Sequence, residues 1–192
     1  MKVLVACEYS GTVRDAFIRK GHDAISCDLL PSESDFGPHY QGDVFDIIGD
    51  GFDLMIAHPP CTYLCRHRSR WNKAEDLKHQ YEARAFFNRF IDADIEKICV
   101  ENPVPLRAIG LDKYDQIIQP YHHGHDHSKK TCLWLKNLPL LEKTNEVELT
   151  YYTTPNGKRY TKGWYFTPRT SIARSRTFKG IADAMAEQWG QL

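Results

Sequence analysis

Cys61 has the sequence position of a reactive thiol. It comes directly after Pro59 and Pro60, and these two prolines follow the apolar run at residues 54–57. Each proline fixes one φ angle and lacks an N–H donor, so a strand formed by that run must stop there. The thiol is then held at the carboxyl end of a buried strand, which predicts covalent chemistry by a cysteine nucleophile.

Glu101 is the matching candidate for acid–base work. Together with Asn102 it follows a second short apolar run, at residues 98–100. In open parallel α/β sheets the carboxyl ends of the strands lie at one edge, and ligands bind at that edge. We therefore expect Glu101 and Cys61 to face one substrate.

The elements that must position these residues alternate along the chain. Short apolar runs predict strands at 3–6, 24–27, 54–57, 98–100 and 131–135, with helices at 13–20, 74–91 and near the carboxyl terminus. Such alternation is typical of an α/β fold with a mostly parallel sheet. A chain of 192 residues with 42% hydrophobic content fits a single domain spanning 1–192.

Two helices carry apolar residues at helical spacing, which predicts that they pack on the sheet. In the long helix these residues are Leu77, Tyr81 and Ala85, with Phe86 and Phe90 beside them, and in the last helix they are Ile181, Ala182, Met185, Ala186 and Trp189.

The charge pattern points to local contacts with nucleic acid. The 25 basic and 25 acidic side chains cancel, so no global field attracts a polyanion. Every formal side-chain charge between residues 149 and 182 is nevertheless positive, and the insertion near 142–170 is rich in tyrosine, with a Pro-Asn-Gly turn that suggests a hairpin or a flexible loop. A second basic cluster, including Arg66 and Arg68, follows Cys61. A solvated surface loop is the alternative interpretation of the insertion.

The amino terminus opens directly into a strand-like run that is too short for a signal-peptide core or a membrane span. Four of the six cysteines lie in or beside apolar runs, as buried free thiols do. We therefore expect a cytoplasmic protein from a reduced compartment, with no membrane association.

The turn after the first strand is a candidate cofactor loop. Gly11 permits close approach of a ligand, and Ser10 or Thr12 would cap the following helix. Asp28 ends the next strand, where a carboxylate accepts hydrogen bonds from ribose hydroxyls. Asp43 would bind an adenine amino group or, equally, cap a turn. A full GxGxxG phosphate cradle is missing from the sequence, which favours a nucleoside cofactor without phosphates.

With these residues in place, the chain resembles the DNA cytosine-5 methyltransferases, and more closely their small, phage-type relatives from DNA modification and restriction systems. The motifs occur in the family's order: the first loop, the ribose acid, the adenine contact, Pro60-Cys61, Glu101-Asn102, a basic motif at 128–131 and a closing motif at 180–182. The resemblance implies a Rossmann-like fold and S-adenosylmethionine as cofactor. It also implies roles for particular residues: Cys61 and Glu101 in catalysis; Ser10, Gly11, Asp28, Asp43 and Pro59 in cofactor binding; Pro60, Asn102, Arg66, Arg68, Lys129 and Lys130 in substrate binding.

The sequence also departs from the family's usual pattern. His58 and Thr62 flank the Pro-Pro-Cys run where the family has Gly and Gln, Pro103 follows Glu-Asn, and lysines replace the late arginines. Little chain is left for a large target-recognition domain. The substrate implied is DNA, single- or double-stranded, or a cytidine nucleotide. The sequence leaves open the transferred group, methyl or related, and the oligomeric state.

Three alternatives have sequence support. His58-Pro59-Pro60-Cys61 faintly resembles the Asp/Asn-Pro-Pro-aromatic motif of amino-group methyltransferases, which act on N4 of cytosine or N6 of adenine. A zinc-containing protein would use Cys61, Cys65 and His67 with the histidines at 122–127, although this spacing fits no usual structural zinc pattern. A catalytically inactive DNA-binding protein is the third.

Overall fold

Four apolar runs of the sequence form neighbouring parallel strands. The structure, a computed structural model, describes residues 1–65 and 76–192. Side chains in the two middle strands, at residues 2–6 and 54–57, are almost all buried, as expected for a sheet covered on both faces. The four strands lie in the order β2-β1-β4-β5, and their bounds are Lys2–Ala6 for β1, Asp23–Asp28 for β2, Leu54–Ala57 for β4 and Lys97–Pro103 for β5.

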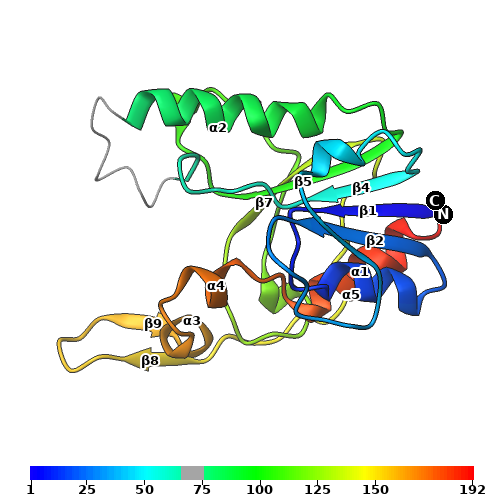
Figure 1. Cartoon of the computed structure of the whole chain (residues 1–192). Helices are drawn as coiled ribbons and strands as arrows, with labels where there is room; N and C mark the ends of the chain where they lie inside the picture. Colours follow the sequence, from blue (N-terminus) through cyan, green and yellow to red (C-terminus); the bar gives the residue numbers. More distant parts are fainter. Residues whose placement is uncertain (66–75) are drawn as a thin grey trace.

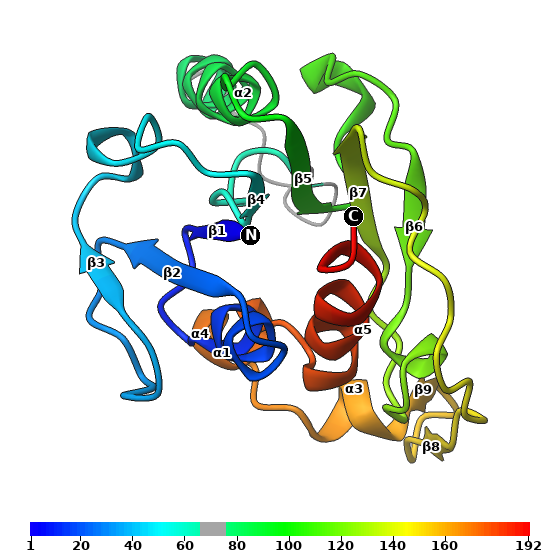
Figure 2. The same cartoon turned by 90° about the vertical axis from the view of Figure 1, so that its right-hand side faces the viewer.

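Three further strands complete a seven-stranded sheet of order β3-β2-β1-β4-β5-β7-β6 (Figures 1 and 2). β7 pairs antiparallel with both β5 and β6, and the other neighbouring pairs are parallel. The predicted α/β class with a mostly parallel sheet is confirmed. The added strands are β3 (His39–Gln41), β6 (Gln116–Ile118) and β7 (Thr131–Lys136), and short 3₁₀ turns occur at η1 (Val44–Asp46), η3 (Arg107–Ile109) and η4 (Pro120–His122).

Helices α1 (Thr12–Arg19) and α5 (Lys179–Trp189) pack together on one face of the sheet, and α2 (Asp76–Ile91) covers the other (Figure 2). The alternation of side chains along β1 divides the core in the same way. Val3 and Val5 belong to the α1–α5 side, while Leu4 belongs to the α2 side. The apolar residues predicted for the last helix are all buried.

The buried face of α2 agrees with the prediction at Phe86 and Phe90, which pack in the core, and differs from it at the first three predicted positions. Phe87 and Phe90 are buried, whereas Leu77 and Tyr81 are 53% and 70% exposed, and Ala85 is exposed as well. A spacing of four residues advances the side chain by about 40° more than one helical turn, so such a series drifts off the buried face. The first turns of α2 also extend beyond the carboxyl ends of β1 and β4 (Figure 1), where the sheet no longer covers them.

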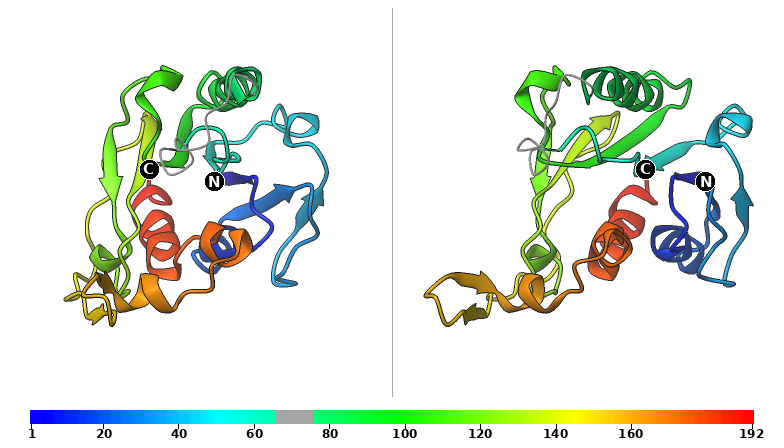
Figure 3. Two further views of the ribbon diagram at one scale, coloured as in Figure 1. Left: turned by 90° about the vertical axis from the view of Figure 1, so that its left-hand side faces the viewer. Right: turned by 60° about the vertical axis from the view of Figure 1, so that its left-hand side comes forward.

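The basic-aromatic segment forms the predicted hairpin. β8 (Tyr151–Thr153) and β9 (Arg159–Thr161) pair antiparallel, followed by α3 (Lys162–Phe166) and α4 (Ser171–Ser175). The hairpin projects away from the main sheet on the side where β1 and β4 end (Figures 1 and 3). No helix in the described part of the chain combines the length and apolar composition that a transmembrane span needs.

Candidate functional site

The strand ends bring the predicted catalytic residues to one cavity. Cys61 and Glu101, which follow or end β4 and β5, line a cavity of about 160 Å³ at the carboxyl edge of the sheet. Residues 7–10, which follow β1, line the same cavity, because β1 pairs directly with β4 and β4 with β5. The arrangement is the one predicted for a nucleophile and an acid facing one ligand.

The Cys61 thiol is activated by its neighbours. Cys65 donates a hydrogen bond to its sulfur, and the positive charge of Lys129 acts in the same direction, so together they lower the pKa of Cys61 although burial opposes them. The backbone N–H of Cys65 donates a hydrogen bond to the Cys61 carbonyl oxygen at 3.1 Å, and the turn closed by this bond brings the two residues together. The two prolines line the cavity beside the thiol. A larger fraction of Cys61 is therefore present as the thiolate near neutral pH.

Glu101 is paired with His58, a residue whose role the sequence analysis missed. His58 Nδ1 lies 3.0 Å from Glu101 Oε2, and the two side chains are only 14% and 11% exposed. Burial opposes both charges, but the hydrogen bond and the mutual attraction outweigh it, so the pKa of His58 is raised and that of Glu101 is lowered. The pair thus holds one proton beside the cavity. Its sequence signal was a polar residue at the carboxyl end of a buried strand.

His58 also carries an enclosed hydrogen-bonding atom. Its Nε2 is buried and has no partner among the described residues, and the side chain lines the cavity. In a protonated imidazole both ring nitrogens are donors. Protonated His58 therefore has one N–H donor, at Nε2, that the described residues leave unused.

The first loop is organised by Glu8. Its carboxylate accepts hydrogen bonds from the backbone N–H groups of Val13 at 2.7 Å and Arg14 at 3.2 Å, and from the Ser10 hydroxyl at 3.2 Å. Glu8, rather than Ser10 or Thr12 alone, satisfies the start of α1. Because a carboxylate already occupies the position where this helix would bind an anion, the loop fits a cofactor without phosphates.

Ser10 and Gly11 differ in their relation to the cavity. Ser10 lines it, whereas Gly11 does not. Gly11 has a φ of 72°, and a Cβ there would lie 2.6 Å from the Arg14 guanidinium. Its glycine is thus required by the turn and by local packing.

Asp28 and Asp43 lie next to the cavity without lining it. Asp28 accepts a hydrogen bond from the Leu30 N–H, and Asp43 accepts one from Phe45 N–H at 3.0 Å and caps η1. Asp43 therefore caps a turn, which was the alternative to its predicted contact with an adenine amino group. Burial raises the pKa of the Cys7 thiol to about 12, with the charges of Asp28 and Asp43 adding to it. Since Cys7 lines the cavity, both carboxylates border its first-loop side.

The predicted substrate residues are dispersed. Pro60 and Lys129 line the cavity, whereas Lys130 is exposed and does not. Asn102 is fully buried and donates a hydrogen bond from Nδ2 to the Pro103 carbonyl oxygen at 2.6 Å, and it does not line the cavity. Arg66 and Arg68 lie outside the described residues.

The histidines at 122–127 make separate structural contacts. No group of three metal-ligating side chains is found within residues 1–65 and 76–192. The contacts are His123 Nδ1 with Thr144 Oγ1 at 3.1 Å, His125 Nε2 with the Gly180 N–H at 2.9 Å, and His127 with the Phe178 ring at 4.8 Å.

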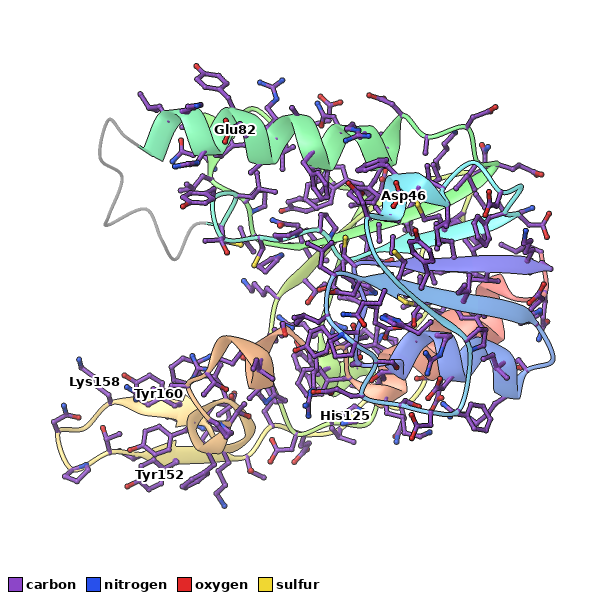
Figure 4. All side chains as sticks on the ribbon, in the orientation of Figure 1. Asp46, Glu82, His125, Tyr152, Lys158 and Tyr160 are labelled. Atoms are coloured by element: carbon purple, nitrogen blue, oxygen red, sulfur yellow. The ribbon has the colours of Figure 1, made fainter. Side chains whose placement is uncertain are left out.

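The aromatic residues of the insertion pack mostly on one another. Tyr152 lies 4.5 Å from Tyr165 between ring centroids, and Tyr160 stacks on Trp164 at 5.2 Å. Figure 4 shows Tyr152, Lys158 and Tyr160 on the hairpin, at a distance from the sheet. The segment is therefore an ordered protrusion with cations on its surface.

Comparisons with known proteins identify the fold. No protein-family model matches the sequence, and no curated protein is similar to it. An E. coli prophage protein proposed to be a DNA modification methyltransferase superposes with a TM-score of 0.51 at 12% identity, over 78% of this chain and 53% of that one. The Entamoeba histolytica methyltransferase EhMeth superposes with a TM-score of 0.51 at 14% identity, over 77% of this chain and 57% of its own. The chain thus spans little more than half the length of these proteins, and it has the Rossmann-like fold of methyltransferases.

Proposed function

We propose that this protein transfers a methyl or related group from S-adenosylmethionine to carbon 5 of cytosine in DNA, through a covalent adduct with Cys61 assisted by Glu101. The observation that carries the proposal is the shared cavity: two residues forty positions apart, on neighbouring strands, meet around one ligand-sized space. The methyltransferase fold and the lowered pKa of the thiol support it.

The cofactor site would follow from the first loop. Ser10 and Pro59 line the cavity, Asp28 and Asp43 border it, and Glu8 excludes a phosphate from the start of α1. When bound, S-adenosylmethionine would supply an electrophilic methyl group. Asp28 is the expected acceptor for the ribose hydroxyls.

The chain's own residues would act on the pyrimidine. The Cys61 thiolate forms a bond to carbon 6, and the electron pair of the 5,6 double bond moves into the ring toward N3. Glu101 faces N3 and the exocyclic amine, while His58 holds the proton that neutralises the developing charge. After transfer, a water molecule or a nearby base takes the carbon-5 proton, the electron pair of the broken C–H bond re-forms the 5,6 double bond, and Cys61 leaves carbon 6 as the thiolate with the electron pair of the C–S bond.

The test is product analysis with a trapping control. Wild-type protein is incubated with S-adenosylmethionine and, separately, with cytosine-containing duplex DNA, single strands and cytidine nucleotides, and the nucleosides are analysed by mass spectrometry. We expect 5-methylcytosine, and a covalent complex with DNA that contains 5-fluorocytosine. Cys61→Ser should abolish both, whereas Cys132→Ala, which changes another buried thiol, should retain both.

Other products would contradict the proposal. Amino-methylated bases that persist in Cys61→Ser would identify an amino-group methyltransferase. DNA binding with no cofactor-dependent product on any substrate would identify an inactive binding protein.

A further inference from the structure

The acidic groups of the cavity already have partners. Glu101 is paired with His58, and Glu8 accepts the N–H groups at the start of α1. Among the described residues, neither carboxylate forms a direct ion pair with a further cation of the cavity wall. Two such cations remain to be explained, Lys129 and Arg174.

Arg174 has an enclosed guanidinium with unused donors. Its Nε and Nη2 atoms are buried, and they have no hydrogen-bond partner in the described part of the chain. Its neighbour Arg176 differs, because Arg176 Nη2 lies 2.6 Å from Glu33 Oε1 in an exposed ion pair. Arg174 as a whole is half-buried, but enclosed donors without a partner are costly, so these two nitrogens are available to an anionic ligand that enters the cavity.

Aromatic stacking fixes the direction of this guanidinium. Arg174 Cζ lies 4.8 Å from the centre of the Trp164 ring, and Trp164 stacks on Tyr160 of β9 with an interplanar angle of 16°. Stacking on a ring face leaves the N–H edge of a guanidinium available for an oxyanion. Arg174 thus connects the aromatic surface of the hairpin to the cavity that holds Cys61.

Lys129 supplies a second positive charge from a different element. It precedes β7 and lines the same cavity, and its charge acts on both Cys61 and Glu101. Its ammonium forms no ion pair with any residue for which the structure gives a position. Two cations from separate segments therefore border the space beside the proposed nucleophile.

We infer that Arg174, with Lys129, binds a phosphate group of the nucleotide whose base enters the cavity. The inference rests on the proposed function and deepens it, because it defines the substrate as a phosphodiester-linked nucleotide in a strand rather than a free nucleoside. A planar guanidinium matches two phosphate oxygens at once, while Lys129 contributes a point charge. The carboxylate of the cofactor's methionine end is the other source of an oxyanion, and the test separates the two.

The test measures binding without turnover. The probe is a fluorescent nine-residue single strand with one cytosine among thymines, used in three forms: natural, with neutral methylphosphonates on both sides of the cytosine, and with two methylphosphonates at one end. Affinities are measured by fluorescence anisotropy for wild type, Arg174→Gln, Arg174→Lys and the control Arg176→Gln.

We expect Arg174→Gln to bind the natural strand about 10-fold or more weakly, as for loss of a charge-assisted hydrogen bond. The flanking methylphosphonates should weaken wild type to a similar extent and should hardly weaken Arg174→Gln further. Arg174→Lys should be intermediate, and Arg176→Gln should keep the full sensitivity to the flanking linkages. A merely structural role of Arg174 would not remove this sensitivity.

Three results would overturn the inference: unchanged affinity of Arg174→Gln for the natural strand, undiminished sensitivity of this variant to the flanking linkages, or a wild type that binds none of the strands. In the second arm of the test, calorimetry measures the affinity of wild type and Arg174→Gln for S-adenosylmethionine. Lost cofactor affinity in Arg174→Gln, with strand binding intact, would assign the residue to the cofactor carboxylate and overturn the phosphate assignment. Formation of 5-methylcytosine by wild type tests the proposed function separately, so either idea can fail alone.

Discussion

Replacing His58 with glutamine would test the buried pair with Glu101 through its pH dependence. Glutamine can still donate a hydrogen bond to Glu101 but carries no charge. The raised pKa of His58 means that its stabilisation is fully present below the unfolded-state pKa of about 6.5 and is lost as pH rises through the folded-state value. The lowered pKa of Glu101 means that its stabilisation is present above about 4.3 and is lost as pH falls.

The charge effect is therefore largest between these limits, near pH 5.5, and it decreases at higher pH as folded His58 loses its proton. A hydrogen bond to a charged group contributes about 1.5–3 kcal/mol, and a neutral one about 0.5–1.5 kcal/mol. We expect His58→Gln to lower the free energy of unfolding by about 1–1.5 kcal/mol more at pH 5.5 than at pH 9. In a chain of this length that difference corresponds to about 2–6 °C in Tm.

Urea denaturation of wild type and variant at both pH values measures the difference directly. Any loss from the changed shape of the side chain is common to both pH values and cancels. His79→Gln is the matched control, because His79 Nδ1 lies 3.3 Å from Glu82 Oε2 with both side chains more than half exposed. The control should change by less than about 0.5 kcal/mol at either pH. A loss in His58→Gln that is equal at the two pH values, or larger at pH 9, would refute the charged pair.

Three other substitutions test the lowered pKa of the Cys61 thiol and the packing of α2. Cys65→Ala removes a hydrogen bond to Cys61, so the pKa of Cys61 should rise and the midpoint of its alkylation by iodoacetamide should move to higher pH. Cys61→Ser gives the background alkylation of the other cysteines. An unchanged midpoint in Cys65→Ala would contradict the role of this hydrogen bond. Phe87 is 1% exposed and packs edge-on against Trp134 at 4.9 Å, so Phe87→Ala should cost about 3–5 kcal/mol in urea denaturation. Tyr81→Ala, at a position 70% exposed, should change stability by less than about 0.5 kcal/mol, and similar losses for both would show that the buried face of α2 is misassigned.

The meeting of Cys61 and Glu101 was predictable because it depends on local signals and one topological rule. Apolar runs gave the strands, and Pro59 and Pro60 gave the point where β4 stops. Parallel neighbours then place their carboxyl ends at one edge. The hairpin was predictable for a similar reason, since its turn residues and strand residues are adjacent in sequence.

The partners of these groups were not predictable from sequence. His58 and Glu101 are 43 positions apart, and their 3.0 Å contact depends on the relative register of β4 and β5. The face of α2 depends on how the helix is rotated over the sheet, which residue spacing alone did not fix.

Sequence by itself thus determined the α/β fold class and the position of Cys61, the proposed nucleophile, at the carboxyl edge of the sheet, because these follow from backbone sterics and hydrophobic burial over a few residues. Only the tertiary structure decided which charges are neutralised and which remain unpaired, as with Glu101 and Arg174. The physical reason is that segments distant in the sequence determine both the partner of a charged group and how deeply that group is buried. A local sequence pattern does not specify how closely such segments approach each other.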